Sequence, residues 1–283
     1  TNDFWTTEPE WDELWGFENR GGFNASSCAT YSYSSTSRGC YEYTAQAGSD
    51  INAVGAFASW GGVNTGIKDL SGGENIVAVL DSGIRYTHED LKDNYIGGYD
   101  FAYEDNDPSD YQGHGTHVAG TIGAASNGKG VIGSNPAAKL IAVKVLDNNG
   151  NGNTGWITQG LNYAASQGAK IANMSLGGSG YNSSFYYAAK NFQDTGGLIV
   201  ASAGNNARFD NQNLGNIDPG NYPNYPAAFD LPGIISVGNS QEDDWKSAGS
   251  CWGSNNVDLF APGNNIYSAG HTSDSSYVYK GRT

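Results

Sequence analysis

The chain has 283 residues, of which 38% are apolar and 12% aromatic, so it can bury the core of one large α/β domain, and global disorder is excluded. Its formal net charge of −15, from 14 basic and 29 acidic residues, argues against nucleic acids and anionic membranes as partners. No apolar run reaches the roughly 18 residues of a transmembrane helix. Where carboxylates cluster, the acidic balance favours hard cations such as Ca²⁺.

The N-terminal part of the chain is predicted to be peripheral. Residues 1–25 carry three tryptophans among acidic residues with no clean period, which is typical of an arm on the domain surface. Residues 26–48 are rich in Ser, Thr, Tyr and Gly and are predicted to form an inserted loop. Cys28 and Cys40 flank the loop, where a disulfide is expected in an exported protein, with two free thiols as the alternative. Because the chain does not begin with Met and shows no signal peptide, we expect a processed or excised piece.

From residue 76 onward the pattern predicts a buried parallel sheet. Six continuous apolar runs of strand length are typical of strands covered on both faces, and segments of helix length lie between several of them. The fold is therefore predicted to be α/β, in three layers, with a mostly parallel β-sheet and helices on both faces. The predicted strands are Ile76–Leu80, Leu140–Val145, Ile171–Met174, Leu198–Ala201, Ile234–Val237 and Val257–Phe260, and the predicted helices are 50–60, 116–126, 154–167 and 182–195.

Ligands of such sheets bind at the carboxyl ends of the strands, where two candidate catalytic residues lie. Asp81 ends the first buried strand, so its carboxylate could accept an imidazole N–H, or it could simply make a strand-end turn. His114 opens the following helix and could act as a general base. His117 lies three residues later. Two alternatives therefore remain: both histidines could bind a metal, or His117 could have a structural role. The other two histidines, His88 and His271, are expected at the surface.

Two more strands end in glycine turns. The backbone edge formed by Ser175, Leu176, Gly177 and Gly178 could pair with an extended peptide by strand addition. In the segment Ala203, Gly204 and Asn205, the Asn205 amide could donate to a developing oxyanion. Each motif taken alone is equally consistent with a plain strand-to-loop turn.

The order Asp, His, Ser-Leu-Gly-Gly and Gly-Asn on successive strand ends resembles the subtilisin-like serine proteases, the subtilases, over about residues 50–270. This resemblance implies a secreted, monomeric serine endopeptidase whose residues 1–283 form a single catalytic domain. It implies that Asp81 orients His114, that His114 moves the proton, and that Asn205 with a backbone N–H holds the oxyanion. Its partners would be polypeptide substrates and its own propeptide. The segments that carry the resemblance are Val79–Ile84, Gly113–Gly120, Ser175–Gly178, Ala203–Asn205 and Ala261–Gly263.

The resemblance also implies a cleft and a structural calcium site. The second edge of the substrate cleft would be Gly150, Asn151 and Gly152. The Ca²⁺ ligands would be Asp3, Asp90 and Asn127 with the backbone carbonyls of Ala125, Lys129 and Val131. Separately, Asp105, Asp107 and Asp110 crowd the loop before His114, where they could wrap a second cation or form a solvated acidic loop.

The family's nucleophile is a serine in a Gly-Thr-Ser motif that opens a buried helix, and residues 1–283 contain no such motif. The chain ends at Gly281-Arg282-Thr283, so Thr283 would match the Thr of that motif, although Arg282 stands where the motif has Gly. We therefore expect a fragment whose C-terminal part, with the serine, is missing. A noncatalytic peptide-binding pseudoprotease and a metal-dependent hydrolase using His114 and His117 are the alternatives.

We predict that the polypeptide of residues 1–283 alone does not turn over a peptide substrate. Loss of the nucleophile from such a catalytic unit typically lowers kcat on the order of 10⁶-fold. The measurement is hydrolysis of a chromogenic peptide by the purified 283-residue chain. Full turnover would show that the nucleophile lies within these residues.

Overall fold

The computed structural model describes residues 76–205, 223–241, 244–253 and 256–280, together with the backbone of two short N-terminal strands. These strands, β1 (Asn24–Ser27) and β2 (Tyr41–Thr44), pair antiparallel, so the segment predicted to be an inserted loop contains part of a two-stranded sheet. The predicted arm, the helix at 50–60 and the Cys28–Cys40 bridge otherwise lie outside the described residues. Within those residues, no helix has the length and apolar character that crossing a membrane requires.

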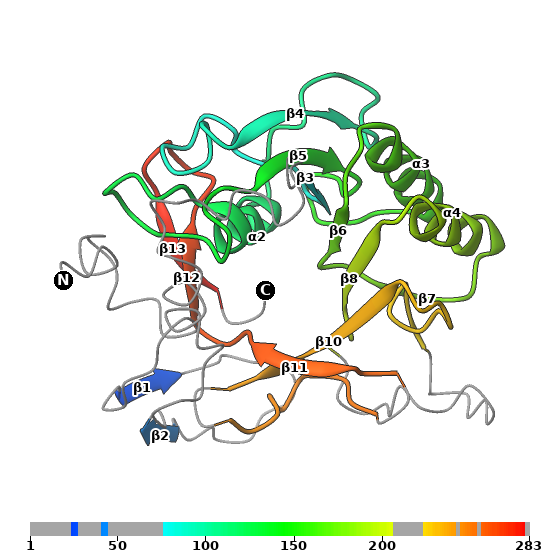
Figure 1. Ribbon diagram of the computed structural model, residues 1–283. Coiled ribbons are helices and arrows are strands. Elements are labelled where there is room, and N and C mark those ends of the chain that lie inside the picture. The colour runs from blue at the N-terminus through cyan, green and yellow to red at the C-terminus, as the bar shows by residue number, and fades with distance from the viewer. Residues whose placement is uncertain are drawn as a thin grey trace.

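A seven-stranded sheet in which every paired strand is parallel forms the centre of the molecule (Figure 1). Its strand order is β11-β10-β8-β6-β3-β5-β4. The six predicted strands are all present, which confirms the α/β prediction. In chain order the strands are β3 (Ile76–Asp81), β4 (Tyr95–Asp100), β5 (Lys139–Lys144), β6 (Ile171–Met174), β8 (Leu198–Ser202), β10 (Ile234–Ser240) and β11 (Leu259–Pro262).

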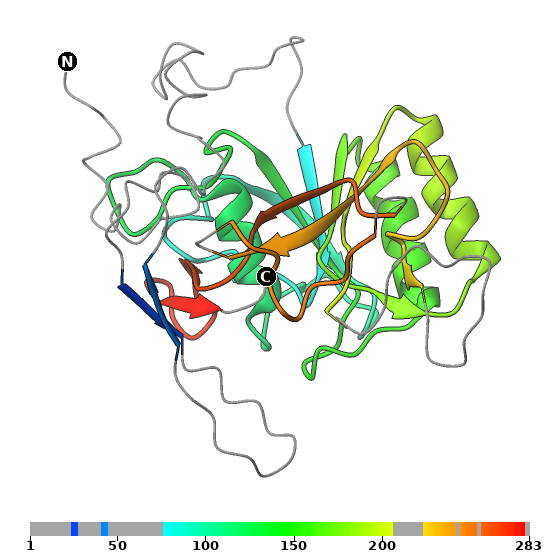
Figure 2. The same ribbon diagram turned by 90° about the horizontal axis from the view of Figure 1, so that it is seen from below.

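Helices cover both faces of this sheet, as predicted. The helix α2 (His114–Gly123) lies on one face, and α3 (Thr154–Ser166) and α4 (Ser183–Asp194) lie on the other (Figure 1 and Figure 2). The sheet has a separate hydrophobic core on each face, and β3 contributes to both. Successive side chains along the strand point to opposite faces. Ala78 and Leu80 pack with α3 and α4, whereas Val77 and Val79 pack with α2.

The edge strand β4 was not predicted from the sequence. Its segment Tyr95–Asp100 contains two glycines and only one fully buried residue, so it lacks the apolar run that marks the inner strands. Two small antiparallel pairs were also missed. The strand β7 (Gly178–Ser179) pairs with β9 (Asn224–Tyr225), and β12 (Ile266–Ala269) pairs with β13 (Tyr277–Lys280).

The β12–β13 hairpin packs directly on α2 and is held there by His117. His117 is fully buried, and its Nε2 lies 3.0 Å from the carbonyl oxygen of Ile266 and 3.2 Å from that of Val278. The prediction that His88 lies at the surface was wrong. His88 is also fully buried, with its Nδ1 3.2 Å from the Asp90 amide and its Nε2 2.9 Å from the Ser276 carbonyl. Both imidazoles therefore tie the hairpin to the core.

We predict that His117 makes the fold sensitive to acid. Burial lowers the pKa of His117 to about 4, whereas an unfolded histidine titrates near 6.5. As the pH falls from about 6.5 towards 4, the unfolded chain binds a proton that the folded chain does not, so stability is lost in this window, by up to about 3 kcal/mol. Chemical denaturation at pH 7.5 and pH 5 should show a smaller pH-dependent loss for His117→Gln than for the parent. An equal loss in both proteins would contradict this role.

Candidate active site

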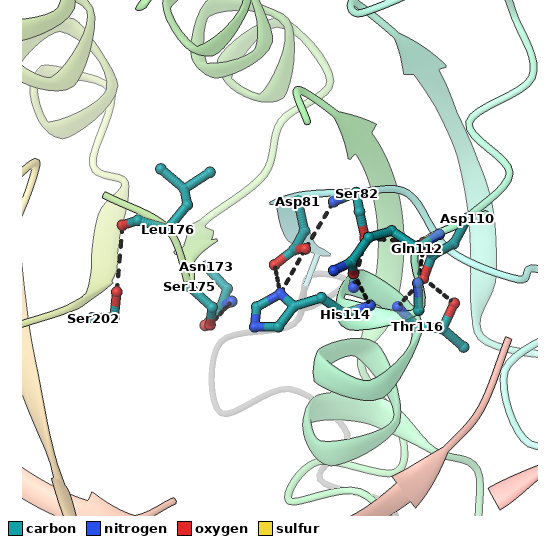
Figure 3. Close-up of polar contacts among 12 residues, drawn as sticks. Asp81, Ser82, Asp110, Gln112, His114, Thr116, Asn173, Ser175, Leu176 and Ser202 are labelled. Atoms are coloured by element: carbon teal, nitrogen blue, oxygen red, sulfur yellow. Dashed lines mark hydrogen bonds and ion pairs between the residues drawn. The ribbon is translucent and has the colours of Figure 1, made fainter. Parts of the chain in front are cut away.

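Asp81 and His114 are in direct contact where β3 ends and α2 begins. Asp81 has no exposed surface, and the His114 side chain is 23% exposed. The Nδ1 of His114 lies 2.8 Å from Oδ1 and 2.9 Å from Oδ2 of Asp81 (Figure 3). A neutral imidazole held in this way carries its proton on Nδ1, which leaves the lone pair of Nε2 free to accept a proton.

The surroundings of His114 favour its charged form. Burial acts to lower the pKa of His114, but the negative charge of Asp81 and its hydrogen bond outweigh burial, so the pKa is raised above its ordinary value. The charge of Lys280 acts to lower this pKa, and that of Asp110 acts to raise it. The site is therefore built to stabilise an imidazolium once His114 has taken a proton.

Asp81 and His114 meet because the backbone segments that carry them pack closely, and glycines make this close packing possible. Gly115 lies so near the turn after Asp81 that a Cβ there would collide with the carbonyl oxygen of Gly83. Gly113 adopts φ 95° immediately before α2, a conformation that favours glycine. The glycines on both sides of His114 thus let the helix begin against the end of β3.

The three acidic residues before His114 do not form a cation site. Asp110 is buried, and its carboxylate accepts hydrogen bonds from the turn around His114. Asp105 and Asp107 are exposed, and they accept hydrogen bonds from the backbone of their own loop. Across the described ranges, no three His, Cys, Asp or Glu side chains converge as metal ligands. The idea of a second cation here does not fit the structure, because local amides already occupy these carboxylates.

A metal held jointly by His114 and His117 does not fit either. His114 directs Nδ1 to Asp81, whereas His117 lies on the buried side of α2 and directs Nε2 to two carbonyls of the β12–β13 hairpin. This geometry fits the other alternative for His117, in which the imidazole has a structural role.

A cleft of about 500 Å³ opens beside His114. One wall contains Gly150 and Gly152, and the other is the predicted binding edge, Ser175 to Gly178. Asn151 lies between the two glycines but does not line the cleft, because its backbone is turned to Asp147. Both predicted edges therefore line one space, and their exposed glycines leave backbone groups accessible to an extended peptide.

A second cavity, of about 440 Å³, also borders His114. Its polar lining includes Ser175, Gly204 and Asn205, and its apolar lining includes Val118 and Val237. Ala203 does not line it, because it is buried and donates its N–H to the Val237 carbonyl, 2.8 Å away. His114 thus lines both a peptide-sized cleft and a cavity whose lining includes the predicted oxyanion donor.

Asn224 is a site residue that the sequence did not reveal. Its amide donates to the Ser202 carbonyl at 3.1 Å, and a Cβ on Gly177 would collide with it. Asn224 therefore joins the binding edge to the segment that carries Asn205. It lies in no recognisable motif, and it reaches the site only because β9 pairs with β7, a contact with no local sequence signal.

The predicted calcium residues surround one buried carboxylate. Asp90 accepts hydrogen bonds from the Val131 amide at 3.0 Å, the Asn127 side chain at 3.1 Å and the Tyr277 hydroxyl at 2.9 Å. Desolvation by burial raises the pKa of Asp90. The loop of residues 125–131, which includes Ala125 and Lys129, thus folds over Asp90. Asp3 lies outside the described residues.

Comparisons with known proteins agree with this geometry. Residues 72–282 match the model of the subtilase family. The chain is 40% identical over 198 residues to thermitase of Thermoactinomyces vulgaris, covering 70% of this chain and 66% of thermitase. It is 42% identical over 206 residues to the major intracellular serine protease of Bacillus subtilis (strain 168), covering 69% of this chain and 60% of that protein.

A solved structure shows the same fold. It is described as a cold adapted subtilisin-like serine proteinase, and it is 33% identical with a TM-score of 0.60, covering 76% of this chain and 73% of that chain. The chain spans less than two thirds of the length of both thermitase and the intracellular protease. On the match of its sequence to the family model, together with this fold, the chain belongs to the subtilase family.

Proposed function

We propose that the protein is a secreted, monomeric serine endopeptidase and that this chain supplies its substrate cleft and two members of its triad. The observation that carries the proposal is the buried Asp81–His114 pair, whose histidine lines both a peptide-sized cleft and the cavity that contains Asn205. A subtilase family model matching residues 72–282 supports the same activity.

In the proposed reaction, an extended polypeptide lies as an added strand between Gly150–Gly152 and Ser175–Gly178. A serine from the full-length protein attacks the scissile carbonyl while His114 Nε2 takes its proton. Asp81 stabilises the imidazolium, and the Asn205 amide with a backbone N–H stabilises the oxyanion. His114 then donates the proton to the leaving amine, and water repeats the sequence on the acyl-enzyme.

We place the segment that bears the serine in the second cavity. This cavity adjoins His114 and Asn205, the two groups that must contact the nucleophile and the oxyanion. Its lining also includes Val118, Val200 and Val237, an apolar surface suited to packing against a helix. The proposal thus assigns the two cavities different occupants, substrate in one and the nucleophile segment in the other.

We predict that a serine-directed phosphonate labels the full-length protein and stops its hydrolysis of casein. His114→Ala should lower kcat on the order of 10⁶-fold, as expected for loss of the base in such a unit. Exposed Asp105→Asn, a matched control in the preceding loop, should keep the parent rate. Immediate inhibition by a chelator without phosphonate labelling would contradict a serine mechanism.

A peptide-binding pseudoprotease is the second candidate, because none of the 283 residues forms a Gly-Thr-Ser motif. The same labelling experiment separates the two functions. A pseudoprotease would bind peptides in the cleft with micromolar affinity or better, yet it would neither react with the phosphonate nor release products.

We also propose that Asp90 and the loop of residues 125–131 hold a structural Ca²⁺. The donor set fits a hard cation, because a buried carboxylate lies beneath a loop that offers several carbonyl oxygens, and no ion pair between described residues neutralises Asp90. One change is required. The Asn127 amide points its NH₂ group at Asp90, so it must turn to offer its oxygen. The ligands would be Asp90, Asn127 and the carbonyls of Ala125, Lys129 and Val131.

We predict that Ca²⁺ raises the thermal midpoint of the parent and that excess EGTA reverses the shift. Asp90→Asn should abolish most of the shift, because it removes the only described carboxylate among the proposed ligands. Asp93→Asn, three residues further along and exposed, is the matched control and should respond as the parent does. An equal Ca²⁺-dependent shift in both variants would contradict this site.

A further inference from the structure

Asp110 is a second buried carboxylate beside the Asp81–His114 pair, and it is only 4% exposed. Its Oδ1 accepts hydrogen bonds from the Ser82 hydroxyl at 3.0 Å, the Gln112 amide at 2.9 Å and the Gly113 amide at 2.8 Å. Its Oδ2 accepts from the amide of Thr116 at 2.9 Å and from its hydroxyl at 2.6 Å. Five donors therefore converge on one side chain that touches neither Asp81 nor His114 (Figure 3).

These donors come from the two backbone segments that carry the catalytic pair. Ser82 follows Asp81 directly, and its N–H donates to Asp81 Oδ1 at 2.7 Å. Its hydroxyl donates to Asp110 and accepts from the Gly115 amide at 2.9 Å. Gly113 and Thr116 belong to the turn and helix that carry His114. Asp110 thus connects the end of β3 to the start of α2 through one rigid set of hydrogen bonds.

We propose that Asp110, with Ser82 and Thr116, is a positioning clamp that fixes the distance and angle between Asp81 and His114 in the proposed peptidase. This inference rests on the function proposed above. A carboxylate suits the task because it accepts several N–H and O–H donors at once and offers none of its own. Catalysis depends steeply on such geometry, since a displacement of about 1 Å can cost about 10²-fold in rate.

The titratable groups around His114 make it possible to separate a positioning effect of the clamp from an electrostatic effect on the imidazole. They are Asp81 on β3, Asp110 in the preceding loop, His117 on α2 and Lys280 on β13. Removing the charge of Asp110 takes away one contribution that raises the pKa of His114, so this pKa should fall. Ser82→Ala cuts the clamp but keeps that charge, so it should lower the pKa of His114 less than Asp110→Asn does, and only through the altered contact with Asp81.

The test compares Asp110→Asn and Ser82→Ala with the parent in the full-length protein. The Asn side chain presents an NH₂ group to donors that need an acceptor. We therefore expect kcat to fall by about 10²-fold in Asp110→Asn and by about 10-fold in Ser82→Ala, with KM within about twofold because the cleft walls are untouched. Asp107→Asn, an exposed carboxylate of the same loop, is the matched control and should keep the parent kcat.

An NMR titration of His114 provides a readout that does not depend on hydrolysis. Asp110→Asn should lower the pKa of His114, and both variants should weaken the downfield signal of the Nδ1 proton shared with Asp81. Parent-like kcat and an unchanged Nδ1 signal in both variants, or a change in KM alone, would overturn the clamp. If Asp110→Asn does not fold, Ser82→Ala decides the question by the same two criteria. Absence of hydrolysis in the parent would instead count against the proposed function, while the titration would still test the clamp.

Discussion

The active site is organised around one contact, in which a fully buried carboxylate, Asp81, accepts the Nδ1 proton of His114 at 2.8 Å. An ionised carboxylate is costly to bury unless it is hydrogen-bonded, so the surrounding chain must supply donors at fixed places. The parallel sheet places Asp81 at a strand end, and α2 begins against that end. The Ser82 amide donates to the same carboxylate at 2.7 Å, so Asp81 is bound from its own strand and from the helix.

The β12–β13 hairpin holds this arrangement from the other side. It binds His117 on the buried face of α2 through two backbone carbonyls, and it covers His88 through a third. Tyr277 on the same hairpin donates to Asp90 at 2.9 Å, so the proposed calcium loop and the catalytic helix share one support. A structural change in the loop of residues 125–131 can therefore be transmitted to α2 through the β12–β13 hairpin.

The apolar runs and glycine turns predicted the inner strands, the edge strand β11, the three helices from α2 to α4, the strand ends near Asp81 and Asn205, and the helix start at His114. They did so because a strand buried on both faces leaves a continuous local signal. The edge strand β4 was missed because it is partly exposed and interrupted by glycines. His88, Asp110 and Asn224 were misplaced or missed for a different reason. Each has at least one partner that is distant in the sequence, such as Ser276 for His88, Ser82 for Asp110 and Ser202 for Asn224, and no local pattern records such a contact.

Asp81 fixes the tautomer of His114 and raises its pKa, and NMR of the imidazole ring tests this role most directly. In the parent, the proton of neutral His114 should reside on Nδ1, and the pKa should lie above the ordinary value of about 6.5. In Asp81→Asn, burial is no longer opposed by the carboxylate, so the pKa should fall below about 6.5, and the Nδ1–H signal should lose its downfield shift. An unchanged pKa and tautomer in that variant would contradict the account.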